Sequence, residues 1–143
     1  MSKLVGIYER KGQLFISPYH KTKAGFWIGG ENTVTVNRDD IAAIANATVA
    51  ALSESREGVP TPPRDFDPTA SLLAAAGVAS FGTFAKSAKS ITVEVTDGII
   101  EITPDRNRGA REGFVPMLEK KAQFQESDPQ LGIAIIAALE VAE

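Results

Sequence analysis

The chain has 143 residues, a formal net charge of −3 at pH 7 and no cysteine. The lack of cysteine excludes a disulfide framework, a catalytic thiolate and a cysteine-ligated zinc site. The length suits one ordinary domain with a single hydrophobic core, so we expect residues 1–143 to form one domain. A hydrophobic content of 43% and a charged content of 23% are typical of a soluble globular protein.

The sequence predicts a cytoplasmic protein that neither enters a membrane nor binds nucleic acid directly. Its first fifteen residues contain no apolar core of the length found in signal peptides. The most apolar stretch, Leu131–Val141, is too short to cross a bilayer. The sequence pI of about 5.2 indicates no excess of basic side chains, whereas nucleic-acid modules need a concentrated basic face to displace counterions from phosphates.

The first 36 residues are expected to form a β-meander. Lys11-Gly12 is a hairpin signal between two arms of strand-forming residues, Leu4–Tyr8 and Gln13–Ser17. Pro18 is expected to end the second arm. Two short strands are then expected at residues 26–28 and 33–36.

From residue 37 the apolar period becomes helical. One continuous apolar stripe is formed by Ile41, Ile44, Ala45, Thr48, Val49 and Leu52. Asn37 is expected to cap this helix, Asp39 and Asp40 to favour the positive end of its dipole, and Gly58 to stop it. Four prolines within residues 60–68 then predict an extended crossing loop.

The second half is expected to contain short helices and one clear hairpin. A helix over residues 70–76, capped by Thr69 or Asp67, precedes one or two further helical turns over residues 80–88. Apolar and polar residues alternate from Ile91 to Ile102 around Asp97-Gly98, which predicts two strands and a type I′ turn. The hairpin is expected to break at Pro104 into an Arg/Gly-rich loop, and residues 114–118 to add a further strand.

The last element is expected to be a helix over residues 128–142. Ser127 is the expected cap, Pro129 lies in the first turn, and Gln130 is placed to reach back to the cap. These elements together predict an α+β fold, with a mainly antiparallel sheet of about five to seven strands and three to four packed helices.

Few residues point to catalysis. His20 is the only histidine and lies in a polar, lysine-rich stretch, where a surface or structural role is expected. The chain carries no HExxH, EF-hand, Walker A or GxSxG pattern, so we expect no metal site and no cofactor. The basic side chains are expected to be solvated; they are Lys86, Lys89, Arg106, Arg108 and Arg111.

Two alternatives remain open on the residues alone. One is a small hydrolase that uses His20 with nearby loop carboxylates, namely Glu54, Glu57, Asp65 and Asp67. The other is an oligomeric small-molecule-binding domain with Phe26 and Trp27 in its pocket.

Residues 80–114 carry a specific order of aromatic, basic and turn residues. That order runs Ser80-Phe81, Phe84-Ala85-Lys86, Ala88-Lys89, the strand Ile91–Val95, Asp97-Gly98, Ile100–Pro104, Asn107 and Gly113-Phe114. It resembles the immunity proteins of bacterial contact-dependent growth inhibition systems. The terminal segment, with Leu131-Gly132 and Ile135–Leu139, is similar to the ending of that family.

This resemblance implies a protein that is not an enzyme. It implies binding to the C-terminal toxin domain of a cognate inhibition system, commonly a nuclease, so that the active site or the approach of substrate is blocked. Contact residues cannot be transferred within such a family, because each immunity surface matches its own toxin. We expect the partner to contact exposed acidic and aromatic side chains on irregular segments, namely Glu31, Asp65, Phe66 and Asp67.

Overall fold

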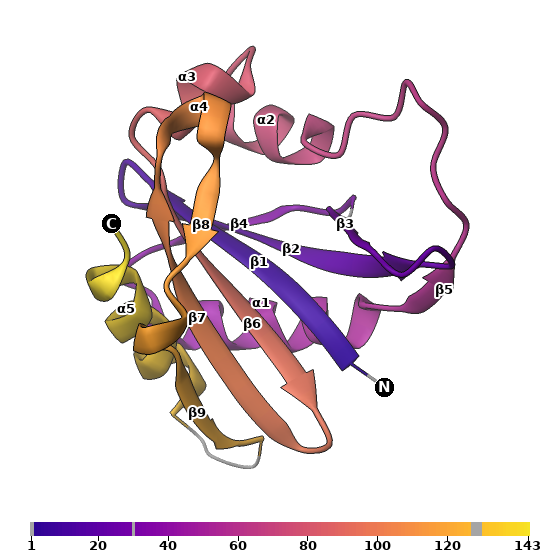
Figure 1. Cartoon of the computed structure of the whole chain (residues 1–143). Helices are drawn as coiled ribbons and strands as arrows, with labels where there is room; N and C mark the ends of the chain where they lie inside the picture. Colours follow the sequence, from indigo (N-terminus) through magenta and orange to yellow (C-terminus); the bar gives the residue numbers. More distant parts are fainter. Residues whose placement is uncertain (1, 30, 127–129) are drawn as a thin grey trace.

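A curled, mainly antiparallel β-sheet runs through the protein, with helices on both of its faces (Figure 1). The computed structural model describes residues 2–29, 31–126 and 130–143. Within them, the main strand order is β3-β2-β1-β6-β7-β8. These strands are β1 (Ser2–Arg10), β2 (Gln13–Thr22), β3 (Trp27–Gly29), β6 (Lys89–Thr96), β7 (Ile99–Asn107) and β8 (Phe114–Pro116).

Three short strands pair beside this main path. β4 (Val34–Asn37) and β5 (Glu57–Val59) both pair with β2, the second of them in parallel, and β9 (Ala122–Gln125) pairs with β7. The helices are α1 (Ile41–Glu54), α2 (Ala70–Ala76), α3 (Phe81–Ala85), α4 (Gly109–Glu112), the 3-10 turn η1 (Leu118–Lys120) and α5 (Leu131–Val141). The predicted α+β class is confirmed.

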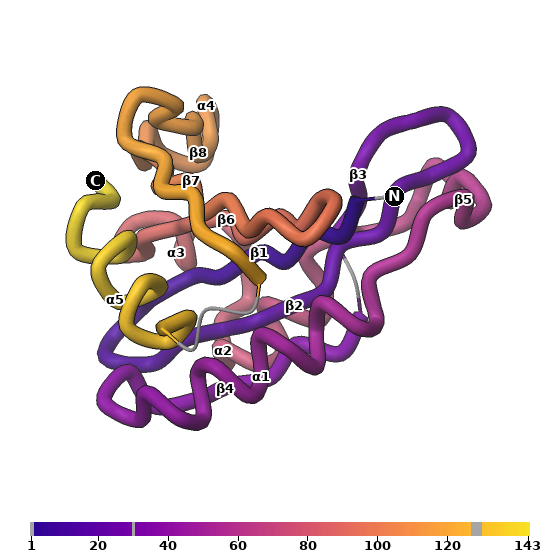
Figure 2. The backbone as a smooth tube through the Cα atoms, turned by 90° about the horizontal axis from the view of Figure 1, so that it is seen from below, coloured from indigo at the N-terminus to yellow at the C-terminus, as the bar shows by residue number. Residues whose placement is uncertain are grey.

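One face of the sheet is covered by α1 and α5, which Figure 2 shows beside each other along the strands. Every second residue of these strands points toward the two helices, because successive side chains alternate between the faces of a sheet. The fully or largely buried side chains on this face are Val5, Ile7, Leu14, Ile16, Ile91, Val93, Ile100 and Ile102. The helices contribute Ile44, Ala51, Leu52, Leu131, Ile135 and Leu139.

The opposite face carries an aromatic cluster beneath α2 and α3. Phe15 of β2 and Phe84 of α3 are fully buried, and their ring centroids lie 5.8 Å apart in an edge-to-face arrangement. Tyr8 of β1 makes edge contacts at 5.3 Å with both Phe84 and Phe114. Aromatic pairs of this geometry add to the stabilisation from burial alone. This cluster explains the aromatic spacing of residues 80–114, which thus belongs to the scaffold.

Both predicted hairpins form, and the turn at Lys11-Gly12 has the same type I′ geometry that the sequence predicts for Asp97-Gly98. Lys11 and Gly12 have φ values of 52° and 78°, and Asp97 and Gly98 have values of 51° and 79°. Positive φ at both central residues defines the type I′ turn, whose twist matches that of the flanking strands.

The expectation that Pro18 and Pro104 end strands is wrong. β2 continues through Pro18, opposite Val5, and β7 continues through Pro104, opposite Ile91. Each proline lies between the segments of its strand that pair with two different outer strands. β4 pairs with residues 13–16 of β2 and β3 with residues 19–21, whereas β9 pairs with residues 99–102 of β7 and β8 with residues 105–107. The N–H that each proline lacks is therefore not needed for pairing with an outer strand.

The helix ends also differ from the sequence-based expectation. Asp40 rather than Asn37 caps α1, because Asn37 is the last residue of β4, and Oδ1 of Asp40 accepts from the backbone N–H of Ala43 at 3.0 Å. α1 ends at Glu54, before Gly58, because residues 57–59 pair with β2. The described part of the last helix starts at Leu131, and the predicted start at residues 127–129 lies outside the described residues.

The apolar stripe predicted for α1 is only partly buried. Ile44 and Leu52 lie in the core, whereas Ile41 and Val49 are 46% and 57% exposed. The strand expected at residues 114–118 ends at Pro116 and continues as η1. None of the helices in the described ranges combines the length and apolarity needed to span a bilayer.

The two helices on the first face approach closely at Gly132. A Cβ at this position would lie 2.7 Å from both Cγ2 and the carbonyl oxygen of Ile41, and 3.5 Å from Cβ of Ala45. Glycine is therefore required where α5 crosses the start of α1, because any side chain would separate the helices.

We expect Gly132→Ala to lower the free energy of unfolding by about 1–3 kcal/mol, the usual cost of overpacking a core. Gly82→Ala in α3 is the matched control, since a Cβ there meets nothing closer than 3.8 Å. It should leave stability unchanged or raise it by up to about 1 kcal/mol through helix propensity. Urea unfolding of both variants checks this, and equal stabilities would contradict the proposed crossing.

A carboxyl group is buried between β6 and β7. Asp105 is 5% exposed, and the Ser90 hydroxyl donates to its Oδ2 at 2.7 Å. Burial raises the pKa of Asp105 above its ordinary range, and the Ser90 hydrogen bond offsets part of that change. The two tyrosines near this carboxyl, Tyr8 and Tyr19, also have raised pKa values, mainly because they are buried.

The pKa of Asp105 in the folded protein lies above its unfolded value of about 3.9. The protonated carboxyl therefore makes its full contribution to the free energy of unfolding below about pH 3.9, and this contribution is lost as the pH rises through the folded-state pKa. The neutral Asn side chain does not titrate, so we expect the stability of Asp105→Asn relative to wild type to rise by on the order of 1 kcal/mol as the pH increases from 4 to 7. Urea titrations across this range measure the difference.

Asp67→Asn provides a control in which the stability relative to wild type is expected to change with pH in the opposite direction. Hydrogen bonds from Thr69 lower the pKa of Asp67, so the exposed carboxylate stabilises the fold above its unfolded pKa and loses that effect as the pH falls. For the Asp105 prediction itself, the contradicting result is a free energy of unfolding that changes with pH in the same way in wild type and in Asp105→Asn. That result would refute a perturbed carboxyl at position 105.

Candidate functional site

Two adjoining hollows form a groove on the side of the sheet where β3, β5 and the proline-rich loop meet β2. We call it the His20 groove, because His20, Asn32 and Val59 line both hollows. The larger, of about 260 Å³, is the Phe66 hollow, lined by His20, Ile28, Gly29, Glu31, Asn32, Val59, Pro60 and Phe66. The smaller, of about 180 Å³, is the Arg56 hollow, lined by His20, Asn32, Glu54, Arg56 and Val59.

The floor of the groove is fixed by backbone pairing on both sides of β2. His20 lies opposite Ile28 of β3, and β5 runs parallel to the end of β2. The segment after α1 enters this edge through Ser55, which is 2% exposed. Its hydroxyl donates to the carbonyl oxygen of Tyr19 and accepts from the N–H of Leu4 at 3.0 Å. Non-local contacts thus bring Arg56 and Val59 beside His20.

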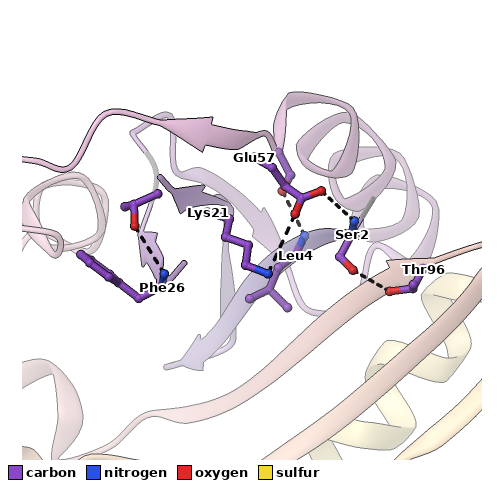
Figure 3. Close-up of polar contacts among 8 residues, drawn as sticks. Ser2, Leu4, Lys21, Phe26, Glu57 and Thr96 are labelled. Atoms are coloured by element: carbon purple, nitrogen blue, oxygen red, sulfur yellow. Dashed lines mark hydrogen bonds and ion pairs between the residues drawn. The ribbon is translucent and has the colours of Figure 1, made fainter. Parts of the chain in front are cut away.

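Glu57 connects β5 to the first two strands. Figure 3 shows its carboxylate between the N–H of Ser2 and the ammonium of Lys21, at 3.2 and 3.9 Å. The Ser2 hydroxyl forms a further hydrogen bond with Thr96 at 2.9 Å. Glu57 therefore supports the edge that carries the groove and does not line it.

His20 is held as a neutral imidazole. Its Nδ1 accepts a hydrogen bond from the Arg56 backbone N–H at 3.2 Å, so the neutral ring carries its proton on Nε2. Burial, followed by the positive charge of Arg56, lowers the pKa of His20, and the carboxylates of Glu54 and Glu31 partly oppose this.

The turn that carries Glu31 is tied to three elements. Asn32, with φ of 65°, donates from Nδ2 to Oε1 of Glu54 at 3.2 Å. The N–H of Thr33 donates to the hydroxyl of Ser71 in α2 at 3.0 Å, and the Thr33 hydroxyl forms hydrogen bonds with Ser17 and Ser71 at 2.8 and 2.9 Å. The wall formed by this turn is thus anchored to β2, α1 and α2.

The proline-rich loop forms a second wall of the groove. Residues 60–68 cross from β5 to α2, as Figure 1 shows. The loop approaches β3 so closely that a Cβ on Gly29 would lie 2.8 Å from the carbonyl oxygen of Pro68. Glycine at position 29 therefore allows the loop to close over this end of the sheet.

The structure brings together two of the four residues expected to contact a partner. Glu31 and Phe66 line the same hollow, with Glu31 exposed and Phe66 half-buried. Asp67 instead shapes its own turn, since Oδ1 accepts from the N–H and the hydroxyl of Thr69 at 2.9 and 2.6 Å. Asp65 is exposed and does not line the groove.

The two alternative sites are assembled only in part. Glu54 shares the Arg56 hollow with His20, whereas Asp65 and Asp67 lie outside the lining. Phe26 is 47% exposed, and Trp27 is half-buried with the Lys21 ammonium 5.9 Å from its ring centroid. Sequence reasoning missed Ile28, Asn32, Arg56, Val59 and Pro60 as lining residues, because their positions depend on the short pairings of β3 and β5.

Comparison with known proteins identifies the fold. No protein-family model and no curated protein sequence matches the chain. A protein of unknown function from Neisseria meningitidis has a similar structure, with a TM-score of 0.82 and 16% identity over 100% of this chain and 96% of the other. A chain from the CdiA-CT/CdiI toxin and immunity complex of Yersinia pseudotuberculosis aligns with a TM-score of 0.70 and 15% identity, over 99% of this chain and 95% of the other. At these identities the likeness shows a shared fold over nearly the whole chain.

Proposed function

We propose that this protein is an immunity protein that binds and neutralises the toxin domain of a contact-dependent growth inhibition system. The observation that carries the proposal is the end-to-end similarity to a chain from the Yersinia toxin and immunity complex, with a TM-score of 0.70. The order of residues 80–114, which resembles the same class of protein, supports it independently.

The charge balance suits a nuclease as the partner. A nuclease that handles a polyanionic substrate needs a basic surface at its active site. This protein has a net charge of −3, so it complements such a surface, which speeds encounter and disfavours wrong partners. We propose that it neutralises the toxin by covering the active site, so that substrate cannot approach.

The polar groups of the His20 groove support binding rather than turnover. His20 uses Nδ1 to accept from the Arg56 backbone N–H and carries its proton on Nε2, so its ring has no free lone pair. A general base needs a free lone pair directed at the group that it deprotonates. We therefore propose a protein without enzymatic activity. The hydrolase alternative keeps one supporting observation, since His20 and Glu54 line the same hollow.

Co-expression tests the proposed function. An immunity protein of this class is expected to be encoded directly after the gene of its large secreted toxin, so the probe is the C-terminal domain of the upstream gene product, expressed from an inducible plasmid. We expect the wild-type protein to restore growth of cells that produce this domain, and the two purified proteins to co-elute in size-exclusion chromatography.

His20→Ala separates binding from catalysis. A binding protein neutralises its toxin by covering it, so His20→Ala is expected to protect the cells whenever the complex still forms, even though His20 lines the groove. Loss of protection while the complex still forms would instead favour the hydrolase. The immunity proposal fails if the wild-type protein neither protects the cells nor binds the domain.

A further inference from the structure

We propose that the Phe66 hollow receives an arginine or lysine side chain from the toxin domain. This inference rests on the proposed function and adds the chemistry of the contact. It draws on the apolar walls of the hollow, its single charged lining residue and the anchoring of both walls.

The walls suit the aliphatic stem of a long cationic side chain. Ile28 of β3, Val59 of β5, and Pro60 and Phe66 of the proline-rich loop present apolar surface from three separate segments. Lysine and arginine pack their methylene groups on such surface while the charged head stays at the polar end. Phe66 also offers an aromatic ring with which a cation interacts favourably.

The charge of the hollow selects a cation. Among its described lining residues, Glu31 is the single one with a formal charge, because His20 is held neutral by burial and by the Arg56 N–H. Arg56 and Glu54 line the neighbouring hollow, where Asn32 binds Glu54. The Phe66 hollow is thus an apolar space with one exposed carboxylate, which attracts a cationic side chain and repels an anionic one.

The hollow is formed before a partner arrives. Thr33 anchors the Glu31 turn to Ser17 and Ser71, and Gly29 allows the proline-rich loop to pack on β3 through Pro68. A preformed hollow avoids much of the entropic cost of ordering side chains on binding. Once the toxin covers it, the pair between Glu31 and the cation is shielded from water and contributes more than an exposed ion pair does.

The test measures the affinity of the full-length protein for the upstream-encoded toxin C-terminal domain by biolayer interferometry. We expect Glu31→Gln and Phe66→Ala each to weaken binding about tenfold or more, mainly through faster dissociation, as for central interface residues. The weakening by Glu31→Gln should shrink as the salt concentration rises, because salt screens the wild-type pair.

Asp65→Asn is the matched control. It removes the same charge from an exposed residue one position before Phe66, outside the lining of the hollow. Its dissociation constant should stay within about twofold of wild type, as for a peripheral charge. Thermal melting of all variants checks folding, and Phe66→Leu replaces Phe66→Ala if the latter is unfolded.

Double-mutant cycles identify the occupant. Each arginine and lysine of the toxin domain is replaced by alanine and measured against wild type and Glu31→Gln. We expect one of these replacements to be non-additive with Glu31→Gln, which marks the two groups as direct neighbours.

The possible outcomes separate this inference from the proposed function. If wild type binds and the folded Glu31→Gln and Phe66→Ala variants bind equally well, the inference is overturned and the proposed function stands. An effect of Phe66→Ala alone, or an effect of Glu31→Gln that couples to no toxin cation, also overturns the cationic occupant. Failure of wild type to bind or protect overturns both.

Discussion

The pairing of β1 with β2 on one side and β6 on the other is the constraint on which the rest of the structure depends. β1 is paired along almost its whole length on both sides, so its alternation decides which side chains enter each half of the core. Val5 and Ile7 face α1 and α5, while Gly6 and Tyr8 face the other way. A Cβ on Gly6 would lie 2.6 Å from the Tyr19 ring, so this glycine lets the tyrosine pack across the central strand. A shift of one residue in this register would move every apolar side chain of β1 to the wrong face.

The groove depends on this scaffold but contributes little to it. β2 pairs with β1 throughout residues 13–19, whereas its outer side is shared between β4 and β3, with β5 joining at its end. The His20 groove lies where these short outer strands meet, and its walls come from segments that leave the core. Under the proposed function, this separation would let the surface match one particular toxin while the fold stays the same.

The comparisons show that this fold tolerates wide changes of sequence. Two solved structures share this fold across almost the whole chain at only 15–16% identity, so very different sequences satisfy the same core. The aromatic and turn residues of the segment 80–114 belong to the part that builds the fold. Phe81, Phe84 and Phe114 lie in the aromatic cluster, and Asn107 donates to the carbonyl oxygens of Ala85 and Ala88 at 2.6 and 2.9 Å. The basic residues of that segment do not line the groove, whose charged lining residues are Glu31, Glu54 and Arg56.

The sequence by itself determined the elements whose signal is local. The period-two pattern of residues 91–102 and the turns at Lys11-Gly12 and Asp97-Gly98 depend only on neighbouring residues and formed as expected. The helix expected from residue 37 also formed, but over Ile41–Glu54. Tertiary structure decided whatever depends on a distant partner. Pro18 and Pro104 remain within strands because the outer strands change there, and Asp40 caps α1 because Asn37 is needed in β4. Likewise, Glu31 and Phe66 share a hollow while Asp65 and Asp67 do not. The loops around His20 are placed by β3 and β5, which pair with β2 through only three and two residues and are too short to leave a periodic signal.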